Sequence, residues 1–343
     1  MVSEAPPFWW TKADWRAWSL APISWIYGAV ARSRMENAPR LAVDVPVLCV
    51  GNFTVGGAGK TPTALALSAA AKKAGLTPGF LSRGYGGNVR KPTIVDKEHH
   101  NAGDVGDEPL LLAQKALTVV SPERPAGARR LIEEGVDFII MDDGFQSAAI
   151  GFDFALLVVD SLRGIGNGHV IPGGPVRAPM VDQMRHASAL LVIGDGRQAY
   201  PVIRVAGRAA KPVHEAKLSV IRPRRFRRQK VLAFAAIGNP EKFFASLHSA
   251  GADIVSARSF GDHHHFVEDE AAELIDTAAA QDLQLVTTSK DMVRLSHAKG
   301  KVAELAEKTD VLEVRLDFDP PGLAQTFVVQ TLQSFKKKAL RSG

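Results

Sequence analysis

The stretch from residue 45 to residue 63, VPVLCVGNFTVGGAGKTPT, constrains the fold more than any other part of the chain. It begins as an apolar, β-branched run and continues as a glycine-rich loop. It ends with Lys60 and Thr61 at the start of an Ala- and Leu-rich helical pattern. A strand, a glycine loop ending in Gly-Lys-Thr and a helix are the three parts of a phosphate-binding P-loop. The sequence therefore predicts a nucleotide site.

Each part of this stretch has a separate chemical task. The loop residues Thr54, Val55, Gly56, Gly57, Ala58 and Gly59 are expected to direct backbone N–H groups at phosphate oxygens. Lys60 adds a positive charge for the β- and γ-phosphates, and the Thr61 hydroxyl can ligate Mg²⁺. The spacing is irregular, because Thr54 stands where the first glycine is usual and the loop has an additional Gly-Gly pair. The alternative is a glycine-rich turn with a chance Lys-Thr, but the flanking patterns favour the P-loop.

The composition is that of a soluble globular protein long enough for two domains. Of 343 residues, 46% are hydrophobic and 23% are charged, and the formal net charge is +6. A positive balance suits an anionic partner such as a nucleotide, a nucleic acid or an acidic membrane surface. Cys49 is the single cysteine, which excludes an intrachain disulfide and a cysteine metal cluster. No uncharged apolar run reaches the ~18 residues of a membrane span.

The first 35 residues contain all of the tryptophans: Trp9, Trp10, Trp15, Trp18 and Trp25. Thr11 and Asp14 resemble a capping box, so a helix is expected from Lys12. Pro22 divides it into pieces near 12–20 and 22–35. A Trp-rich face beside basic residues is typical of a helix that lies in the membrane interface. The alternative is a helix that docks its tryptophans into the protein's own core, and both can hold in part.

Short β-rich runs alternate with helical patterns between residues 45 and 220, which predicts an α/β fold with a mostly parallel sheet and helices on both faces. We expect strands at 45–50, 78–82, 117–120, 137–141, 154–159, 189–193 and 216–221, and helices at 61–75, 107–116 and 125–134. A smaller α/β unit follows, with strands at 231–236, 252–257, 283–288 and 311–316 and helices at 240–250 and 267–280. A last helix is expected at 322–338.

These patterns divide the chain into four parts. An amphipathic membrane-associating segment (1–35) precedes a P-loop domain (36–222). A smaller α/β domain (223–320) and a C-terminal helix (321–343) that packs back on the P-loop domain follow. Since ligands of parallel sheets bind at the carboxyl ends of the strands, the residues after each strand are the candidates for chemistry.

Asp142 and Asp143 end the apolar run VDFIIM and resemble a Walker B element. Two adjacent carboxylates repel each other, and a nearby cation is the simplest way to keep both ionised. The predicted metal ligands are therefore Thr61, Asp142 and Asp143, with the choice between the two carboxylates open. The alternative is an acidic turn before Gly144.

Two other strand-end motifs carry titratable side chains. Asp107, in Gly-Asp-Glu-Pro, is either the N-cap of a helix or a carboxylate that accepts a proton from an attacking hydroxyl. His263, His264 and His265 are consecutive, so they point in different directions, and one histidine paired with a carboxylate is favoured over a metal site.

Three arginines stand in or beside glycine-containing loops: Arg83, Arg124 and Arg177. Arginines at the strand-end face of such a sheet are more often phosphate ligands than packing residues.

The set of motifs resembles the tetraacyldisaccharide 4'-kinases, the lipid A 4'-kinases of Gram-negative bacteria. The matching segments are GNFTVGGAGKTP (51–62), LSRGYGG (81–87), GDEP (106–109), MDDGFQ (141–146), IPGGPVR (171–177), FGDHHHF (260–266) and TTSKD (287–291). They occur in the expected order behind an aromatic N-terminus. Ser289 and the triple histidine depart from the family pattern, and the latter leaves the acting histidine open.

The resemblance implies transfer of the ATP γ-phosphoryl group to the 4'-hydroxyl of a tetraacylated disaccharide 1-phosphate, with Mg²⁺. It implies a peripheral enzyme on the cytoplasmic face of the inner membrane, with ATP, the lipid A disaccharide 1-phosphate and the membrane surface as partners, and no nucleic acid. Asp107 is then the general base and His263 its partner across a domain cleft. Arg83, Arg124 and Arg177 are then candidates for the lipid's phosphate and sugar.

Two other functions share part of these features. A membrane-associated P-loop NTPase switch needs the P-loop, the double Asp and the anchor, but not Asp107, His263 or the arginines. A P-loop kinase for another metabolite does not need the N-terminal tryptophans.

Overall fold

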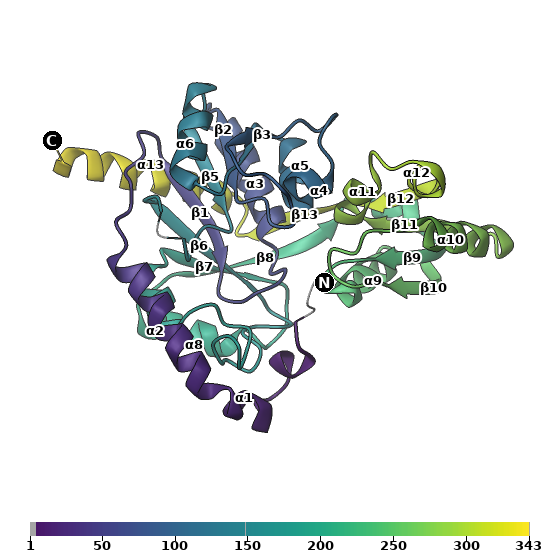
Figure 1. The fold of residues 1–343 in the computed structure, drawn as a ribbon, viewed down its shortest axis with the longest axis horizontal. Coiled ribbons are helices and arrows are strands. Elements are labelled where there is room, and N and C mark those ends of the chain that lie inside the picture. The colour runs from purple at the N-terminus through teal and green to yellow at the C-terminus, as the bar shows by residue number, and fades with distance from the viewer. Residues whose placement is uncertain (1–4, 148, 343) are drawn as a thin grey trace.

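The computed structural model describes residues 5–147 and 149–342, which form two lobes that lie side by side (Figure 1). The large lobe comprises the described residues up to 220 together with 314–342, and the small lobe comprises 221–313. Within the described chain, nine strands form the sheet of the large lobe and four form that of the small lobe. Helices connect the strands in both, so the predicted α/β class is confirmed.

The large sheet is mixed, with parallel inner strands and antiparallel strands at both edges. In spatial order its strands are β13 (Val314–Asp319), β8 (Val213–Val220), β7 (Ala189–Ile193), β6 (Phe154–Asp160), β1 (Val47–Asn52), β5 (Phe138–Asp142), β2 (Pro78–Ser82), β4 (Thr118–Val120) and β3 (Thr93–Ile94). The strands expected at 78–82 and 189–193 match to the residue. β1, which leads into the P-loop, lies between β6 and β5 in the middle of the sheet.

Two apolar layers cover the faces of this sheet because side chains alternate along each strand. Leu48 and Val50 pack with α3 and α13 on one face, whereas Val47 and Cys49 pack on the other. The helices on the first face are α3 (Lys60–Lys73) and α13 (Leu323–Ser342), and those on the second are α2 (Ala21–Asn37), α6 (Arg124–Glu133), α7 (Met180–His186) and α8 (Tyr200–Arg208). Two short helices, α4 (Ala102–Val105) and α5 (Asp107–Ala113), pack beside β4.

The small lobe is a parallel sheet with its own apolar layers. Its strands in spatial order are β10 (Asp253–Ser259), β9 (Lys230–Ala235), β11 (Gln284–Thr288) and β12 (Thr309–Leu312). Its helices are η2 (Pro223–Phe226), α9 (Pro240–Ser249), α10 (Glu268–Ala280), α11 (Ser289–Leu295) and α12 (Gly300–Lys308). The carboxyl ends of β9 and β11 lead to the junction with the large lobe.

The single strand expected at 311–316 is wrong, because the chain changes sheets within it. β12 pairs with β11 in the small sheet, and β13 pairs antiparallel with β8 in the large sheet. Leu312 packs in the core of the small lobe and Leu316 in that of the large lobe. Residues 314–320, which were expected in the smaller domain, lie after the crossing and therefore belong to the large lobe. The small lobe is an insertion between two paired strands, and Ile221 N–H donates to Glu313 O at its base (2.8 Å).

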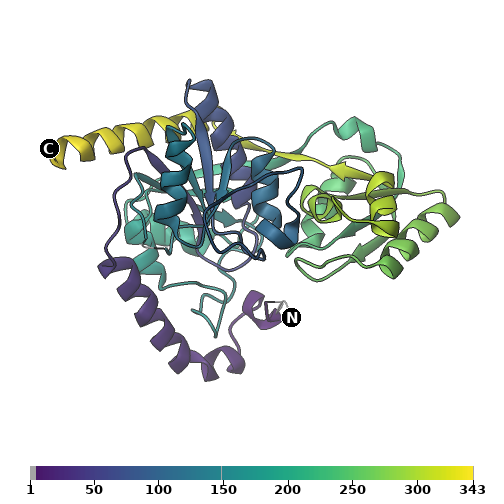
Figure 2. The same cartoon turned by 45° about the horizontal axis from the view of Figure 1, so that its top comes forward.

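The N-terminal segment forms η1 (Pro7–Trp10), α1 (Trp15–Ser19) and then α2. The helix start expected at Lys12 is wrong. Asp14 is the N-cap of α1, and its carboxylate accepts from Arg16 N–H. The Thr11 hydroxyl instead donates back to Phe8 O. The segment follows the edge of the large lobe (Figure 2).

The tryptophans of this segment differ in their exposure. Trp9 is buried, and its Nε1–H donates to Pro172 O (3.0 Å). Trp15, Trp18 and Trp25 are 76%, 63% and 76% exposed, while smaller side chains such as Ser24 face the large lobe. One tryptophan therefore docks into the protein, three face outward, and half-buried Trp10 lies under the Arg163 guanidinium, whereas the membrane-interface alternative stays a prediction. None of the described helices combines the length and apolar character needed to cross a membrane.

Candidate active site

The P-loop occupies the turn between β1 and α3. Gly59 has a φ of +93° and ends the loop in the left-handed region, where an added Cβ would meet Ile193 at 2.6 Å. Gly56 and Gly57 are exposed, with open space where a Cβ would stand. Thr54 and Ala58 are buried and Val55 is half-buried. The backbone between 55 and 59 is thus open to a ligand at the N-terminus of a 14-residue helix, the position that favours phosphate.

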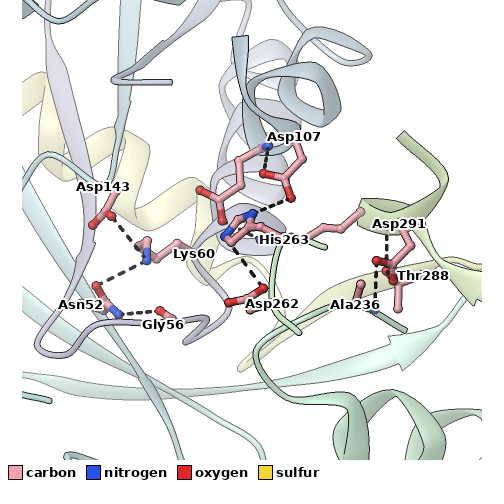
Figure 3. A network of polar contacts seen from close by, with 12 residues as sticks. Asn52, Gly56, Lys60, Asp107, Asp143, Ala236, Asp262, His263, Thr288 and Asp291 are labelled. Carbon is pink, nitrogen blue, oxygen red and sulfur yellow. Dashed lines mark hydrogen bonds and ion pairs between the residues drawn. The ribbon is translucent and has the colours of Figure 1, made fainter. Parts of the chain in front are cut away.

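Lys60 and Thr61 form the first turn of α3 and are both buried. The Lys60 ammonium lies 3.4 Å from Asn52 Oδ1 and 3.8 Å from Asp143 Oδ2 (Figure 3). These long contacts hold the ammonium over the loop with acceptors from the chain itself. A bound phosphate would offer it closer and more highly charged oxygens.

Asp142 and Asp143 end β5 beside β1, where Asp142 is in register with Val50. Asp142 is 1% exposed, and neither of its carboxylate oxygens has a hydrogen-bond partner in the described part of the chain. Burial, followed by the charge of Glu108, raises the pKa of Asp142. A buried carboxylate without a partner is costly unless a ligand completes it.

Asp143 differs from its neighbour because its backbone turns into the left-handed region, with a φ of +49°. Its carboxylate accepts two hydrogen bonds from the Arg177 guanidinium, at 2.7 and 3.0 Å. Burial alone would raise the pKa of Asp143, but Lys60 and Arg177 outweigh it and lower the pKa. Asp143 is therefore ionised and already paired.

The arginines predicted to bind the lipid lie in three environments. Arg124 is 3% exposed, and its Nη2 donates to Asp143 O at 2.9 Å. Arg177 also donates through Nε to Thr54 O (3.0 Å), so it joins the P-loop to Asp143. Arg83 is exposed directly after β2. The structure gives Arg124 and Arg177 contacts within the large lobe, and a lipid-binding role for the three remains a prediction.

Asp107 follows Gly106, whose φ of +89° and close approach to Tyr85 O exclude a side chain. The expectation that Asp107 is an N-cap is wrong: Gly106 is the N-cap and Asp107 is the first residue of α5. Asp107 Oδ1 accepts from Glu108 N–H, and Oδ2 lies 3.2 Å from His263 Nδ1 (Figure 3). The structure thus brings together the two residues predicted to act as base and partner, one from each lobe.

The three consecutive histidines point to different neighbours. His263 contacts Asp107, His264 Nε2 lies 2.7 Å from Glu270 Oε2, and His265 is exposed. His263 has a φ of +61°, and its N–H donates to Ala236 O at the end of β9. Among the three, the geometry therefore selects His263 as the partner of Asp107.

Sequence reasoning missed the cations that the small lobe directs at the large lobe. Lys242 lies 3.2 Å from Asp160, Lys290 lies 2.6 Å from Glu108, and Arg294 pairs with Asp107. Lys290 and Arg294 lie on α11, directly after β11, and are four residues apart on one helical face. That spacing at a strand end was an available signal, although the partners lie more than a hundred residues away along the chain.

The charges around Asp107 decide its protonation. Burial alone would raise the pKa of Asp107, but the hydrogen bond from His263 and the charges of Lys290 and Arg294 outweigh it and lower the pKa. The same contact with Asp107 raises the pKa of His263. Asp107 is thus an ionised carboxylate with donors on both oxygens.

A cavity of about 460 Å³ lies between α2 and the 167–179 region. Its lining includes Trp25, Gly28, Arg32, His169 and Val170. The segment 161–179, which links β6 to α7, connects this cavity to the P-loop, because Val55 N–H donates to Pro175 O (2.9 Å). One loop therefore contacts both the N-terminal segment and the nucleotide site.

Comparison with known proteins gives a consistent result. The family model described as tetraacyldisaccharide-1-P 4'-kinase matches residues 16–332. A tetraacyldisaccharide 4'-kinase of Sinorhizobium fredii is 58% identical over 343 residues, covering 100% of this chain and 99% of that protein. Its namesake in Rhizobium meliloti is 58% identical over 341 residues and covers 99% of each.

A solved structure shares the fold. LpxK from Aquifex aeolicus, crystallised in complex with ATP, superposes with a TM-score of 0.71 at 22% identity, covering 92% of this chain and 99% of that one. On the family match and the full-length relatives, this chain belongs to the tetraacyldisaccharide-1-P 4'-kinase family.

Proposed function

We propose that this protein transfers the γ-phosphoryl group of ATP to the 4'-hydroxyl of tetraacyldisaccharide 1-phosphate, a step of lipid A biosynthesis. The observation that carries this proposal is the carboxylate of Asp107, paired with His263 across the two lobes (Figure 3). A nucleotide switch needs no such base, because hydrolysis uses a water molecule rather than a positioned alcohol.

The large lobe would bind the donor. Backbone N–H groups of the loop 54–59 and the ammonium of Lys60 would surround the β- and γ-phosphates. Thr61 and Asp142 would hold Mg²⁺, which suits the unpartnered, buried oxygens of Asp142. When bound, Mg²⁺ neutralises charge on the phosphate oxygens. Asp143, already paired with Arg177, would instead hold the P-loop against the end of β5.

The acceptor would react between the lobes. The 4'-oxygen of the acceptor would bond to the γ-phosphorus while the bond between that phosphorus and the bridging oxygen of ADP breaks. Asp107 would take the proton that the 4'-hydroxyl loses in this step. His263 would keep the carboxylate oriented and share the proton. Catalysis of this kind depends on positioning and charge neutralisation more than on covalent help.

The lipid would reach this site from a membrane surface. We propose that the enzyme is peripheral on the cytoplasmic face of the inner membrane, with Trp15, Trp18 and Trp25 in the interface. Exposed aromatic residues on a helix that does not span the bilayer support this placement. The apolar cavity beside α2 and the exposed Arg83 are available for an acyl chain and a phosphate of the acceptor.

The decisive experiment follows labelled γ-phosphate from ATP to purified tetraacyldisaccharide 1-phosphate. Wild-type protein should label the lipid, and Asp107→Ala should lower turnover by roughly 10²-fold or more, the scale of losing a general base, while ATP binding is kept. Label appearing only as free phosphate would support a nucleotide switch. Label appearing on a soluble metabolite but not on the lipid would support the other kinase alternative.

A second experiment tests the membrane placement. Deleting residues 1–35 should move the protein to the soluble fraction, but it also removes the buried contacts of Trp9 and Met35. The sharper variant replaces Trp15, Trp18 and Trp25 with Ser, since these side chains are exposed. Binding to vesicles containing anionic lipid should fall while thermal stability stays unchanged. Full vesicle binding by the triple variant would place the anchor elsewhere.

A further inference from the structure

Arg294 is a buried arginine of the small lobe that reaches a carboxylate of the large lobe. It lies in the last turn of α11, and its side chain is 2% exposed. Its Nη2 group pairs with Asp107 Oδ2 and also lies 3.3 Å from His263 Nδ1. The guanidinium therefore contacts both members of the Asp107–His263 pair on which the proposed function rests.

The other edge of the guanidinium is fixed within the small lobe. Arg294 Nη1 donates to Asp291 Oδ1 at 2.8 Å and to the carbonyl oxygen of Ala236. Asp291 is itself held by the Thr288 hydroxyl (2.6 Å) and by Ala236 N–H (3.1 Å; Figure 3). Arg294 thus cannot move toward or away from Asp107 independently of the end of β9.

The same strand end also fixes His263. Its backbone N–H donates to Ala236 O at 3.2 Å, so His263 and Arg294 share one anchor. A planar guanidinium can bind two carboxylates at once through opposite edges, which the single ammonium of lysine cannot reproduce with the same geometry. The arrangement is a two-sided clamp between Asp291 of the small lobe and Asp107 of the large lobe.

We propose that Arg294 is a positioning residue for the Asp107 base, holding its Oδ2 atom against His263 and fixing the small lobe on the reacting side of the nucleotide site. This inference rests on the proposed function, because it assigns Arg294 a task in the same proton transfer. It adds a residue from the small lobe that lies outside the segments by which the sequence resembles its family.

The electrostatics give the clamp a measurable signature. The charged and titratable groups around Asp107 are His263, Lys290 and Arg294 from the small lobe, with Glu108 beside it and Asp291 behind Arg294. Arg294 contributes to the lowered pKa of Asp107. Removing its charge should therefore raise the pKa of Asp107, so that the acid limb of the pH–rate profile moves to higher pH.

The test compares Arg294→Met and Arg294→Lys with wild-type enzyme in the lipid-phosphorylation assay. Arg294→Met should lower kcat on the order of 10-fold to 10²-fold, the scale of a misplaced catalytic group, with little change in KM for ATP. Its acid limb should shift to higher pH, and added guanidinium ion should restore part of kcat. Arg294→Lys should have a kcat and an acid limb between those of wild type and Arg294→Met. Arg258→Met serves as a control, since Arg258 is an exposed residue of the same lobe paired with Glu273.

Stability is controlled with a second variant, because Arg294→Met leaves the buried Asp291 carboxylate without its cation. The double variant Arg294→Met/Asp291→Asn removes both charges and should show the same shift of the acid limb at a higher thermal stability than Arg294→Met alone. Wild-type kcat, or an acid limb that stays in place in both folded variants, would overturn the inference. Absence of lipid phosphorylation by wild-type enzyme would instead contradict the proposed function.

Discussion

Asp142 and Asp107 are both nearly fully buried carboxylates of the large lobe, yet their surroundings are opposite. Asp142 lies at the nucleotide end of the site with no hydrogen-bond partner among the described residues, and burial raises its pKa. Asp107 lies at the junction of the lobes with donors on both oxygens, and its pKa is lowered. Within the described chain, Asp142 is thus left without a partner, which a bound ligand could supply, whereas the small lobe of the same chain supplies the charged partners of Asp107.

This difference has a consequence for stability. A buried charge that awaits a ligand costs stability in the ligand-free protein, and one that is fully paired becomes costly only when its partner is lost. Removing the carboxylate should therefore lower the free energy of unfolding at Asp107 and raise it at Asp142 in the ligand-free protein.

The largest effect is expected at Asp107. Within residues 5–147 and 149–342, Asp107→Ala leaves Arg294 with only Asp291, and Lys290 with only Glu108, as its paired carboxylate. It should lower the free energy of unfolding by about 3–5 kcal/mol, the range for breaking a buried pair. Urea denaturation followed by circular dichroism measures it. A midpoint equal to that of wild type would mean that the pairing across the lobes contributes nothing to stability.

Asp142→Asn should do the reverse. In the absence of nucleotide and Mg²⁺ it should raise the free energy of unfolding at pH 8 by about 1–3 kcal/mol, since a neutral amide replaces an unpaired buried carboxylate. Mg²⁺-ATP should stabilise wild type more than the variant. A lower free energy of unfolding for Asp142→Asn than for wild type at pH 8 would mean that both carboxylates stabilise the ligand-free protein, contrary to this prediction.

The pH dependence of the Asp142→Asn effect sharpens the same point. The folded pKa of Asp142 lies above its unfolded value near 3.9, so the cost of the carboxylate grows as pH rises from ~4 through the folded pKa. Below that range both proteins carry a neutral side chain, and their thermal unfolding temperatures should converge. A constant difference at every pH would assign the effect to packing rather than to charge.

The smallest effect is expected at His263, which is 26% exposed. Its folded pKa is raised by Asp107, so its contribution to stability is complete below the unfolded pKa of ~6.5 and is lost as pH rises through the folded pKa. His263→Gln should therefore destabilise the protein by up to about 1 kcal/mol more at pH 6 than at pH 9. Thermal denaturation at the two pH values measures this, with His265→Gln, an exposed neighbour, as the control.

Much of the fold could be predicted because its signals are local. The run 45–50 and the helix after it follow from alternation and helical periodicity, and the observed β1 and α3 lie within a few residues of the prediction. The crossing at Glu313 could not be predicted in this way, because β12 and β13 form one nearly continuous β-rich run and only the pairing partners distinguish them. Pairing between distant strands leaves no period in the sequence.

The site shows the same limit. The positions of Lys60, Thr61 and Asp142 follow from motifs that sit on adjacent strands, so their proximity could be expected. The pairing of Asp143 with Arg177 and of Asp107 with Arg294 depends on how loops and lobes meet, and neither pairing was expected. The structure also turns the tryptophans of α1 and α2 outward while small residues such as Gly28 face the protein, an orientation opposite to the one expected from burial of the largest apolar side chains.

The crossing at Glu313 also governs the order in which the molecule can be completed during synthesis. β8 ends at residue 220, but its partner β13 begins at 314, so the pair forms only after the whole small lobe has been made. At ~5–20 residues per second those residues take about 5–20 s. During that time α3 lacks the cover of Phe327 and Val328, which complete its apolar layer. The P-loop helix is therefore one of the first helices of the large lobe to be made and among the last to be covered.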